Sequence, residues 1–516
     1  MSSIRCTADL PEKGILNLNV SARAAFREEN SSRSFLFHRK QCRNCPADSI
    51  SETMTATASS NLVSKVHSPP PVRPIPRPED PRSAEFLSWG ASKDPLGHQV
   101  HWWIAIVACF LQPINPIAAA IGQGVLIGYS ILRLHATWRC LMPLLRSGVV
   151  LAALAIMLWT TIAVAWSPDV GKGLGRVMPM RFLLFSLAIW PVLNRPTPFL
   201  MSLMLGCSVQ AVFQILMFVD WMPNPNYRPW GFNGGLGKHP GNTALWSGCF
   251  VAVLFGVLLA EPRRWATLLP LVAAGLVSLI LSGSRSLVVA LPLGILLVLG
   301  RSLWLGRGRG RGRGILVTAV VIGLVVVSIM AATNALPLKR LDAMVTEFQA
   351  ALVHSNYGTS SGLRLIWWRE SLPIVEEAPI IGHGTGSTAV AYAAQFDQTT
   401  GSDIPSRATG TDNPHSTIVT EAIERGGVGL VLWAVFVLLA LKAAWRRATF
   451  DPAFSGLFGA WVILFIFGVG NSIQLSGIIT AVMGMLIAFT IRRPPVQDPT
   501  LSDSDHAATE ASPAST

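Results

Sequence analysis

The sequence has few charged residues for its length. Only 13% of its 516 residues are Asp, Glu, Lys or Arg, about half the fraction in an average soluble domain. Hydrophobic residues make up 51% of the chain, and the mean hydropathy is +0.45. This composition excludes an ordinary soluble globular protein and predicts an integral membrane protein.

Acidic residues are scarcer than basic ones. The chain has 28 Asp and Glu against 41 Lys and Arg, a formal net charge of +13. Such an excess can indicate nucleic-acid binding, but here the arginines stand beside apolar runs and not in a basic domain interleaved with aromatics. We therefore expect no nucleic-acid partner, and we interpret the arginines as topology signals and contacts to anionic lipids.

Cysteine is also scarce, and the seven present are scattered. None lies in residues 334–425, the only long polar stretch after residue 100, so no disulfide is expected there. Cys42 and Cys45 have the spacing of half a zinc site, but no second pair completes four ligands. His239 and His383 also have no partner at metal-ligand spacing, and the sequence predicts no metal site.

The first hundred residues have no sustained apolar run. Residues 1–100 are rich in Ser, Pro and Arg and cannot bury a core, so we expect a disordered cytoplasmic N-terminal tail. A secretory signal is not expected, because no apolar stretch follows the start directly. Residues 494–516 are expected to form a disordered cytoplasmic C-terminal tail.

Apolar runs follow one another from His101 onward. A spanning helix needs about 20 apolar residues, and the pattern predicts an all-α polytopic membrane protein with about twelve transmembrane helices. Nine are expected in residues 101–333 and three in residues 426–493, with a large loop at 334–425 that contains short helices. The predicted spans are 102–111, 114–132, 147–166, 178–194, 198–220, 241–260, 266–283, 285–300, 315–333, 421–445, 455–470 and 474–491.

Basic residues fall on alternate short loops of this arrangement. The positive-inside rule places those loops, and both termini, in the cytoplasm. The loop at 334–425 is then outside, as a periplasmic loop. The basic residues on the cytoplasmic loops are Arg133, Arg139, Arg146, Arg195, Arg263, Arg264, Arg307, Arg309, Arg311, Arg313, Lys442, Arg446, Arg447, Arg492 and Arg493.

The long loop has helical signals of its own. In residues 336–354, apolar side chains recur at helical spacing and make one face, as in a helix that lies on a membrane surface. Ser360 or Ser361 is expected to cap a second helix, on which Arg364 and Trp368 share a face. The following GHGTGS lacks the lysine of a phosphate-binding loop, so we expect a flexible turn that permits close backbone approach.

Three side chains in this pattern can carry chemistry. Arg285 lies in SGSRS at the outer mouth of a helical hairpin, where it either anchors the interface or binds a phosphate or pyrophosphate. Arg364 is followed by two tryptophans, which suit a membrane interface or a sugar-stacking face. His415 stands where the loop enters a span and can take a proton from a hydroxyl, although a lone histidine is more often structural.

With these residues assembled, the chain resembles the bacterial O-antigen ligase and polymerase family, the Wzy/WaaL-like membrane glycosyltransferases. The resemblance rests on SGSRS, on SGLRLIWWRESLPIVEEAPIIGHGTG and on NPHSTIVTEAIERGGVG, and more weakly on YRPWGFNGGLGKHPGN. Two positions depart from the family pattern: Ser416 follows the histidine in place of Asn, and Gly241 separates Pro240 from Asn242.

The resemblance implies that Arg285, Arg364 and His415 match the family's essential positions. It implies metal-independent, inverting transfer of a glycan from an undecaprenyl-diphosphate donor to a hydroxyl acceptor such as lipid A-core, without a cofactor, at the periplasmic face of the bacterial inner membrane. In that chemistry the arginines stabilise the leaving diphosphate and the histidine activates the acceptor. Further substrate-binding residues are expected to be Arg228, Asn242, Trp368, Arg369 and Asn413.

Three alternatives stay open. The first is a polymerase of the same family, which uses the same donor but a growing glycan as acceptor. The second, transfer to a protein hydroxyl, is also compatible with the chain. The third belongs to another class, a transporter or flippase of a lipid-linked sugar, which should show two related halves and polar residues near the bilayer centre.

Overall fold

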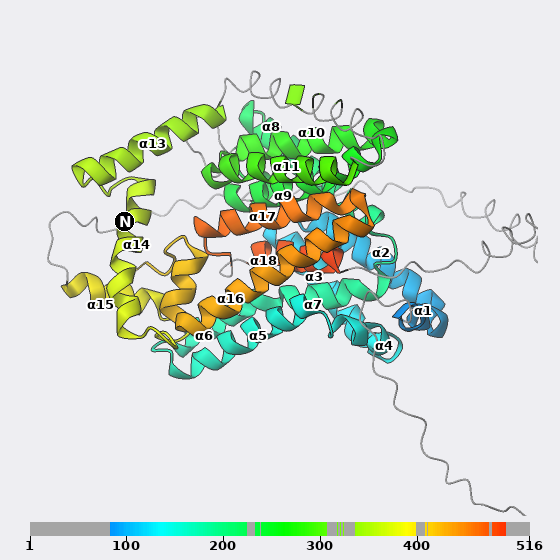
Figure 1. Cartoon of the computed structure of the whole chain (residues 1–516), viewed down its shortest axis with the longest axis horizontal. Coiled ribbons are helices and arrows are strands. Elements are labelled where there is room, and N and C mark those ends of the chain that lie inside the picture. The colour runs from blue at the N-terminus through cyan, green and yellow to red at the C-terminus, as the bar shows by residue number, and fades with distance from the viewer. Residues whose placement is uncertain are drawn as a thin grey trace, which may run out of the picture. The chain divides into compact units, whose positions relative to one another are not determined.

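The computed structural model describes residues 83–223, 233–237, 239–306, 336–398, 408–409, 411–473 and 477–491, with isolated positions between 317 and 324. Every regular element in these residues is a helix (Figure 1). The predicted all-α polytopic class is confirmed. Four of the described helices are α5 (Gly148–Ile162), α6 (Val170–Val177), α7 (Phe182–Ile189) and α18 (Gly477–Thr490).

Fewer helices qualify as membrane spans than the sequence pattern predicts. Within the described residues, 8 helices are long and apolar enough to cross a membrane, or up to 9 if α3 (Pro116–Leu132) and α4 (Leu134–Leu144), bent by 103°, form one broken span. The count of twelve is not confirmed, because α18 is too short to qualify and the expected span at 315–333 falls largely outside the described residues. The spans are Gly148–Trp166, Val170–Val192, Pro196–Phe218, Pro240–Ala260, Pro262–Ser282, Arg285–Leu305, Thr417–Phe450 and Pro452–Val469.

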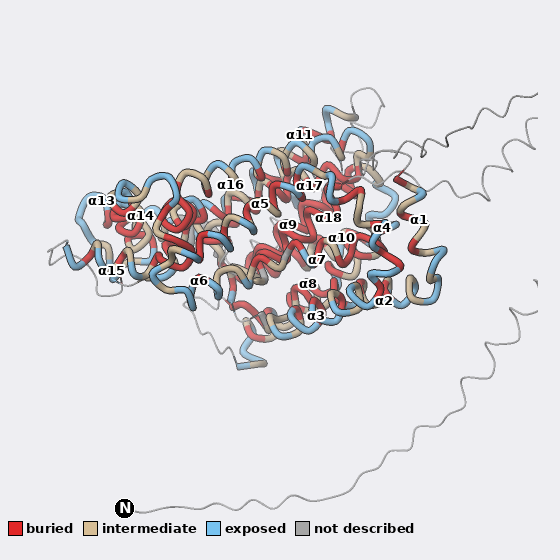
Figure 2. Tube along the Cα trace, turned by 90° about the horizontal axis from the view of Figure 1, so that it is seen from below, coloured by how far each residue is buried: buried red, intermediate tan, exposed pale blue. Residues whose placement is uncertain are grey.

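Helix α9 (Pro240–Ala260) is the centre of the bundle, and nearly all of its residues are buried (Figure 2). Close helix packing here depends on small residues, since a Cβ on Gly256 would lie 2.4 Å from the backbone nitrogen of Gly456. Large apolar side chains on the outer helices, such as Leu158 and Leu438, are exposed as expected for lipid-facing surfaces. The helices around α9 include α8 (Pro196–Phe218), α10 (Trp265–Ser282), α11 (Arg285–Gly306) and α17 (Ser455–Val469).

The N-terminal tail is helical where the sequence pattern predicts disorder. Helices α1 (Ser83–Lys93) and α2 (Pro95–Leu111) occupy residues 83–100 as well as the first predicted span. Asp94 starts α2 as its N-cap and also forms a 2.8 Å ion pair with the buried Arg133. Helix α1 packs against α4. This part of the expected disorder is therefore wrong, because tertiary partners stabilise a segment that is polar in isolation.

The long loop folds into three helices at one end of the bundle (Figure 1). They are α13 (Leu336–His354), α14 (Ser360–Glu377) and α15 (Thr388–Gln398). The expected helices at 336–354 and after residue 359 are present, but the cap of α14 is Thr359, whose side chain accepts a hydrogen bond from Gly362. Helix α13 contacts α11 and α14, so the loop is attached to the bundle through its own helices.

Helix α16 (Thr417–Phe450) returns the chain from the loop to the bundle. Its backbone leaves the helical conformation at Gly426, where φ is 62° and ψ is −158°. The break separates a short first segment, which follows directly on His415, from the long apolar part of the span. The loop therefore reaches the bundle through a helix that is divided in two.

Candidate functional site

Arg285 is the first residue of α11, directly after the turn that ends α10. Gly283 closes α10 in the left-handed conformation, with φ 61°, which turns the chain sharply and puts Arg285 at the outer end of the hairpin. Its guanidinium makes two hydrogen bonds to the Glu347 carboxylate of α13, of 2.6 Å and 2.5 Å. Because this contact joins α11 of the bundle to α13 of the long loop, it ties the loop to the bundle.

Ser361 in the first turn of α14 completes this contact. Its hydroxyl donates to Glu347 at 2.8 Å and lies 3.0 Å from a guanidinium nitrogen of Arg285, while its backbone N–H donates to the same carboxylate at 3.1 Å. Burial alone would raise the pKa of Glu347, but the hydrogen bonds from Arg285 and Ser361 lower it to about 2. Glu347 is therefore ionised at neutral pH and occupies Arg285 as an internal anion.

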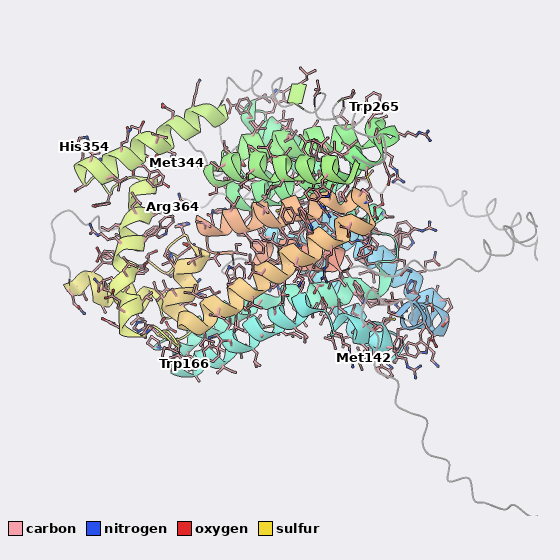
Figure 3. The ribbon with its side chains drawn as sticks, viewed as in Figure 1. Met142, Trp166, Trp265, Met344, His354 and Arg364 are labelled. Carbon is pink, nitrogen blue, oxygen red and sulfur yellow. The ribbon has the colours of Figure 1, made fainter. Side chains whose placement is uncertain are left out.

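Arg364 lies one helical turn after Ser361, on the part of α14 next to α13 (Figure 3). Burial, and then the neighbouring Arg285, hold the pKa of its guanidinium below the usual value, although an arginine stays protonated at neutral pH. Within the described residues its buried Nε has no hydrogen-bond partner. A buried cationic N–H without an acceptor is costly, and an anion at this position would satisfy it.

His415 precedes α16 in a conformation that is rare for a residue other than glycine, with φ 52°. The side-chain oxygen of Asn413 accepts the His415 backbone N–H at 2.9 Å, and Ser472 donates to the same oxygen at 2.9 Å. The imidazole stacks on Trp367 of α14, with ring centroids 5.6 Å apart. These contacts fix the ring against the helix that carries Arg364.

The imidazole of His415 is held in its neutral form. Burial, then the neighbouring Arg364 and His239, lower its pKa to about 4, while Asp412 acts in the opposite direction. At neutral pH the ring can therefore accept a proton. The same electrostatic contributions bring Arg285, Arg364 and His415 into one neighbourhood, since Arg285 acts on Arg364 and Arg364 acts on His415.

Of the five expected substrate-binding residues, Asn413 and Trp368 support His415 directly. Trp368 donates from its indole to the carbonyl of Pro414 at 3.1 Å. The Asn413 side chain accepts a hydrogen bond from the backbone N–H of His415. Both therefore position the loop that carries the histidine. Their predicted contact with substrate stays a prediction.

The other three lie elsewhere. Arg369 is largely exposed and is paired with Glu370 at 2.7 Å and with the Tyr357 hydroxyl at 3.2 Å. Asn242 is half-buried in the first turn of α9, three residues after His239. Arg228 lies outside the described residues.

Sequence reasoning missed Glu347 and considered His239 only as a metal ligand. The Glu347 side chain meets Arg285 across 62 residues of sequence, and His239 acts on His415 from the start of α9. Neither pairing leaves a local signal in spacing or periodicity. The one signal available for Glu347 was its position as an acidic residue beside the apolar face of an otherwise predictable helix.

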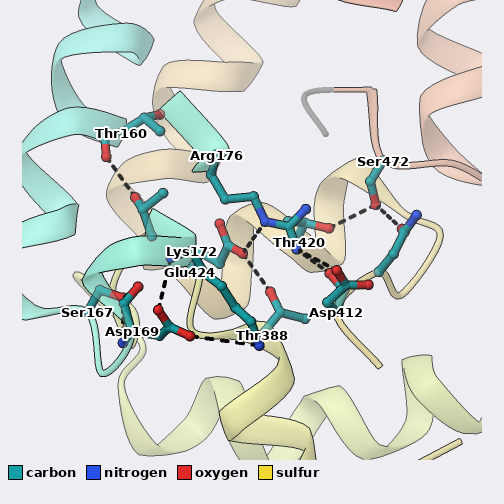
Figure 4. A network of polar contacts seen from close by, with 12 residues as sticks. Thr160, Ser167, Asp169, Lys172, Arg176, Thr388, Asp412, Thr420, Glu424 and Ser472 are labelled. Atoms are coloured by element: carbon teal, nitrogen blue, oxygen red, sulfur yellow. Dashed lines mark hydrogen bonds and ion pairs between the residues drawn. The ribbon is translucent and has the colours of Figure 1, made fainter. Parts of the chain in front are cut away.

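A second charged cluster lies in the protein interior, away from Glu347. Arg425 is 1% exposed and forms a 2.7 Å ion pair with Glu421, one turn earlier in α16. Glu424 lies 3.8 Å from Arg425. It also lies 3.7 Å from Arg176 of α6 and accepts a 2.7 Å hydrogen bond from Thr388 (Figure 4). We call these five residues the anchor network. It joins α6, α15 and α16.

The glycines of GHGTGS pack against this network's helix. A Cβ on Gly382 would lie 2.6 Å from the backbone nitrogens of Arg425 and Gly426, and Gly426 is equally close to Gly382. His383 and Gly384 donate their backbone N–H groups to carbonyls of α16 at 2.9 Å and 3.0 Å. The expected close backbone approach is present, and the backbone that the turn approaches is that of α16.

The part of the chain that the structure describes contains no group of three or more His, Cys, Asp or Glu side chains placed to hold a metal ion. The charges of the site belong instead to two arginines, one carboxylate and a histidine.

The fold and this site define a polytopic membrane protein with a cationic, histidine-bearing site on a helical loop. Residues 270–434 match the family model described as O-antigen ligase, and this segment contains Arg285, Arg364 and His415. Over this segment, which is about a third of the chain, the protein is similar to the O-antigen ligase family. No curated protein sequence matches it.

Proposed function

We propose that this protein transfers a glycan from a polyprenyl-diphosphate donor to a hydroxyl acceptor at the outer face of the inner membrane, as an O-antigen ligase. Arg285 and Arg364 bind the donor diphosphate, and His415 is the general base. Undecaprenyl diphosphate is the expected lipid of the donor, and lipid A-core is the expected acceptor.

The observation that carries the proposal is the pairing of a neutral histidine with a buried arginine that has a vacant N–H. His415 lies in the electrostatic neighbourhood of Arg364, and the Nε of Arg364 has no partner within the described residues. A base needs to be unprotonated near neutral pH, and an anion site needs unsatisfied cationic donors. Both requirements are met within one short stretch of helix α14 and its neighbours.

The two cations suit the chemistry of the donor. When the bond between the anomeric carbon and the diphosphate oxygen breaks, the electron pair leaves on the diphosphate. Fixed positive charge next to that oxygen lowers the barrier, because it is already oriented when the charge develops. Arg364 supplies such a charge from a rigid helix, and Arg285 supplies a second one from the α10–α11 hairpin.

The histidine suits the other half of the reaction. The acceptor oxygen forms a bond to the anomeric carbon while its proton passes to His415. Attack from the side opposite the leaving diphosphate inverts the configuration at that carbon. The imidazole stacks on Trp367, and the Asn413 side-chain oxygen accepts a hydrogen bond from the His415 backbone N–H. Together these contacts hold the residue in one orientation, which supports a role that depends on geometry.

The proposal is tested by transfer in detergent with purified protein, a polyprenyl-diphosphate glycan and an acceptor lipid. We expect product with the native protein and a rate about 10²–10⁴-fold lower with His415→Ala, the usual loss when a general base is removed. His354→Ala is the matched control, because His354 is exposed at the far end of α13. Product formation by His415→Ala at the native rate would refute the catalytic role.

The same assay separates transfer from transport, since a flippase has no measurable reaction in detergent. The acceptor is tested in cells by deleting the gene and examining the glycan ladder on lipopolysaccharide. A ligase predicts that the ladder is absent, whereas a polymerase predicts lipopolysaccharide with a single repeat. An unchanged ladder would contradict both.

A further inference from the structure

A cavity lies at the end of α16 that is away from His415. Its volume is about 720 Å³, and it lies between the C-terminal part of α16, the start of α5 and the end of α18. Four cations line it, and none of its lining residues is acidic. These cations are Arg146, Lys442, Arg446 and Arg447.

The cavity belongs to the opposite face of the membrane from the proposed transfer site. Twenty residues separate the break at Gly426 from Arg446, and a helix rises about 1.5 Å per residue. That part of α16 is therefore about 30 Å long, the thickness of a bilayer's hydrocarbon core. His415 precedes the break, and the cavity follows the far end of the span.

The local structure favours an anion in the cavity. Lys442 and Arg446 are one turn apart on α16, where like charges repel, and neither forms an ion pair within the described residues. The N-terminus of α5 faces the same space through Ser147 and Gly148, and the Ser147 side chain makes no capping hydrogen bond. The first N–H groups of a helix attract negative charge.

The cavity also has an apolar wall. Leu439 and Phe450 line it, and Phe450 is 61% exposed. Leu438, the neighbour of Leu439 on α16, is exposed on the lipid-facing side of the same span. A ligand that matches both walls carries a phosphate beside acyl chains, which a soluble phosphate does not.

We propose that this cavity binds the phosphate of an anionic phospholipid headgroup, with the acyl chains against Leu439 and Phe450. Basic pockets between transmembrane helices are the usual sites for such headgroups. Arg447 is turned partly away, toward Asp451 at 3.9 Å and over the Phe454 ring. Lys442, Arg446 and Arg146 are thus the residues that contact the phosphate. The inference is independent of the proposed transferase function.

The test is lipid binding to the full-length protein, delipidated in detergent, by native mass spectrometry. The probes are dioleoylphosphatidylglycerol and the zwitterionic dioleoylphosphatidylcholine. We expect tighter binding of phosphatidylglycerol, and about fivefold weaker binding for each cation removed, hence about twenty-five-fold for K442Q/R446Q. The matched control R195Q/R263Q removes two exposed cations outside the cavity and should keep native affinity.

A second variant leaves every charge in place. Gly148→Trp fills the cavity, and a Cβ at Gly148 meets only side-chain atoms of Leu439, at 3.7 Å and 3.8 Å. It should abolish the preference for phosphatidylglycerol, whereas Gly128→Trp, on an open surface of α3, should not. Equal binding by K442Q/R446Q and its control would overturn the site, and displacement of the lipid by inorganic phosphate would overturn a lipid as the ligand.

Discussion

The proposed transfer site and the anchor network are built from the same residue types but differ in burial and charge balance. The site has Arg285 and Arg364 against the single carboxylate Glu347, and Arg285 and Glu347 keep 12% and 20% of their side chains exposed. In the network, Arg425 and Arg176 face Glu421 and Glu424, and Arg425 is buried completely.

The difference separates a binding role from a structural one. A balanced and buried set of charges is neutralised by its own ion pairs, and removing one member leaves an uncompensated charge in the interior. A partly open set with one cation in excess can accept an anion. Sequence alone does not separate the two, because Arg364 and Arg425 both lie in the polar loop region between apolar runs.

The largest expected effect is on the anchor network. Arg425→Ala should lower the free energy of unfolding by about 3–5 kcal/mol, because Glu421 then remains buried without its cation. Thermal unfolding followed by intrinsic fluorescence measures this effect. The double change E421Q/R425M removes both charges of the closest pair and should cost less than Arg425→Ala. A cost for Arg425→Ala below about 1 kcal/mol would mean that the network is not an anchor.

Removal of Arg364, the cation in excess at the transfer site, should lower activity and leave stability nearly unchanged. Arg364→Gln is expected to lower kcat/KM by about 10²–10³-fold, the range for loss of one donor to a developing negative charge, with little change in unfolding temperature. Arg369→Gln serves as control, since that arginine is exposed and paired with Glu370. An equal loss of kcat/KM in both variants would contradict a specific role for Arg364 in the site.

The acid side of the pH profile is the third test. In the proposed mechanism neutral His415 is the reactive form, and its pKa is lowered to about 4. The value of kcat/KM should therefore fall only as the pH drops through about 4, and not near the usual 6.5. Arg364→Gln should move this limb upward. The folded protein also binds this proton less readily than the unfolded chain, so the group's contribution to stability is full above pH 6.5 and is lost as the pH falls toward 4.

The smallest effect is expected at the internal anion. Glu347→Gln removes the carboxylate that occupies Arg285, so the donor diphosphate no longer competes with it. We expect the KM for the donor to fall about two- to fivefold, the size of a typical partly exposed ion pair. Steady-state kinetics at varied donor concentration measure this change. A rise in KM would show instead that Glu347 positions Arg285 for the substrate.

The sequence predicts the local parts of this molecule well. Helix α13 has the predicted bounds, because its apolar residues recur with helical period over a continuous stretch. Arg285 is at the end of a hairpin as expected, since a Gly-containing turn between two apolar runs is a local signal. The fold class follows from composition for the same reason.

Contacts between distant segments are the part that sequence does not supply. The Arg285–Glu347 pair and the effect of His239 on His415 depend on how α9, α11 and α13 are placed. The helix at residues 83–93 was missed because its stability comes from packing on α4. The predicted count of twelve spans is not confirmed within the described residues, since apolar runs near the length limit do not reveal which of them are short or bent.

The contact between Gly382 and Gly426 has a mechanical consequence. Backbone atoms at these two positions are so close that no side chain fits between them, and neighbouring N–H groups of the loop bond to α16 on the same side. The loop therefore cannot slide along α16 without breaking several contacts together. A force applied to the loop by a long glycan would pass directly into the membrane-spanning helix, so the pull of a bound polymer would be resisted by the whole bundle.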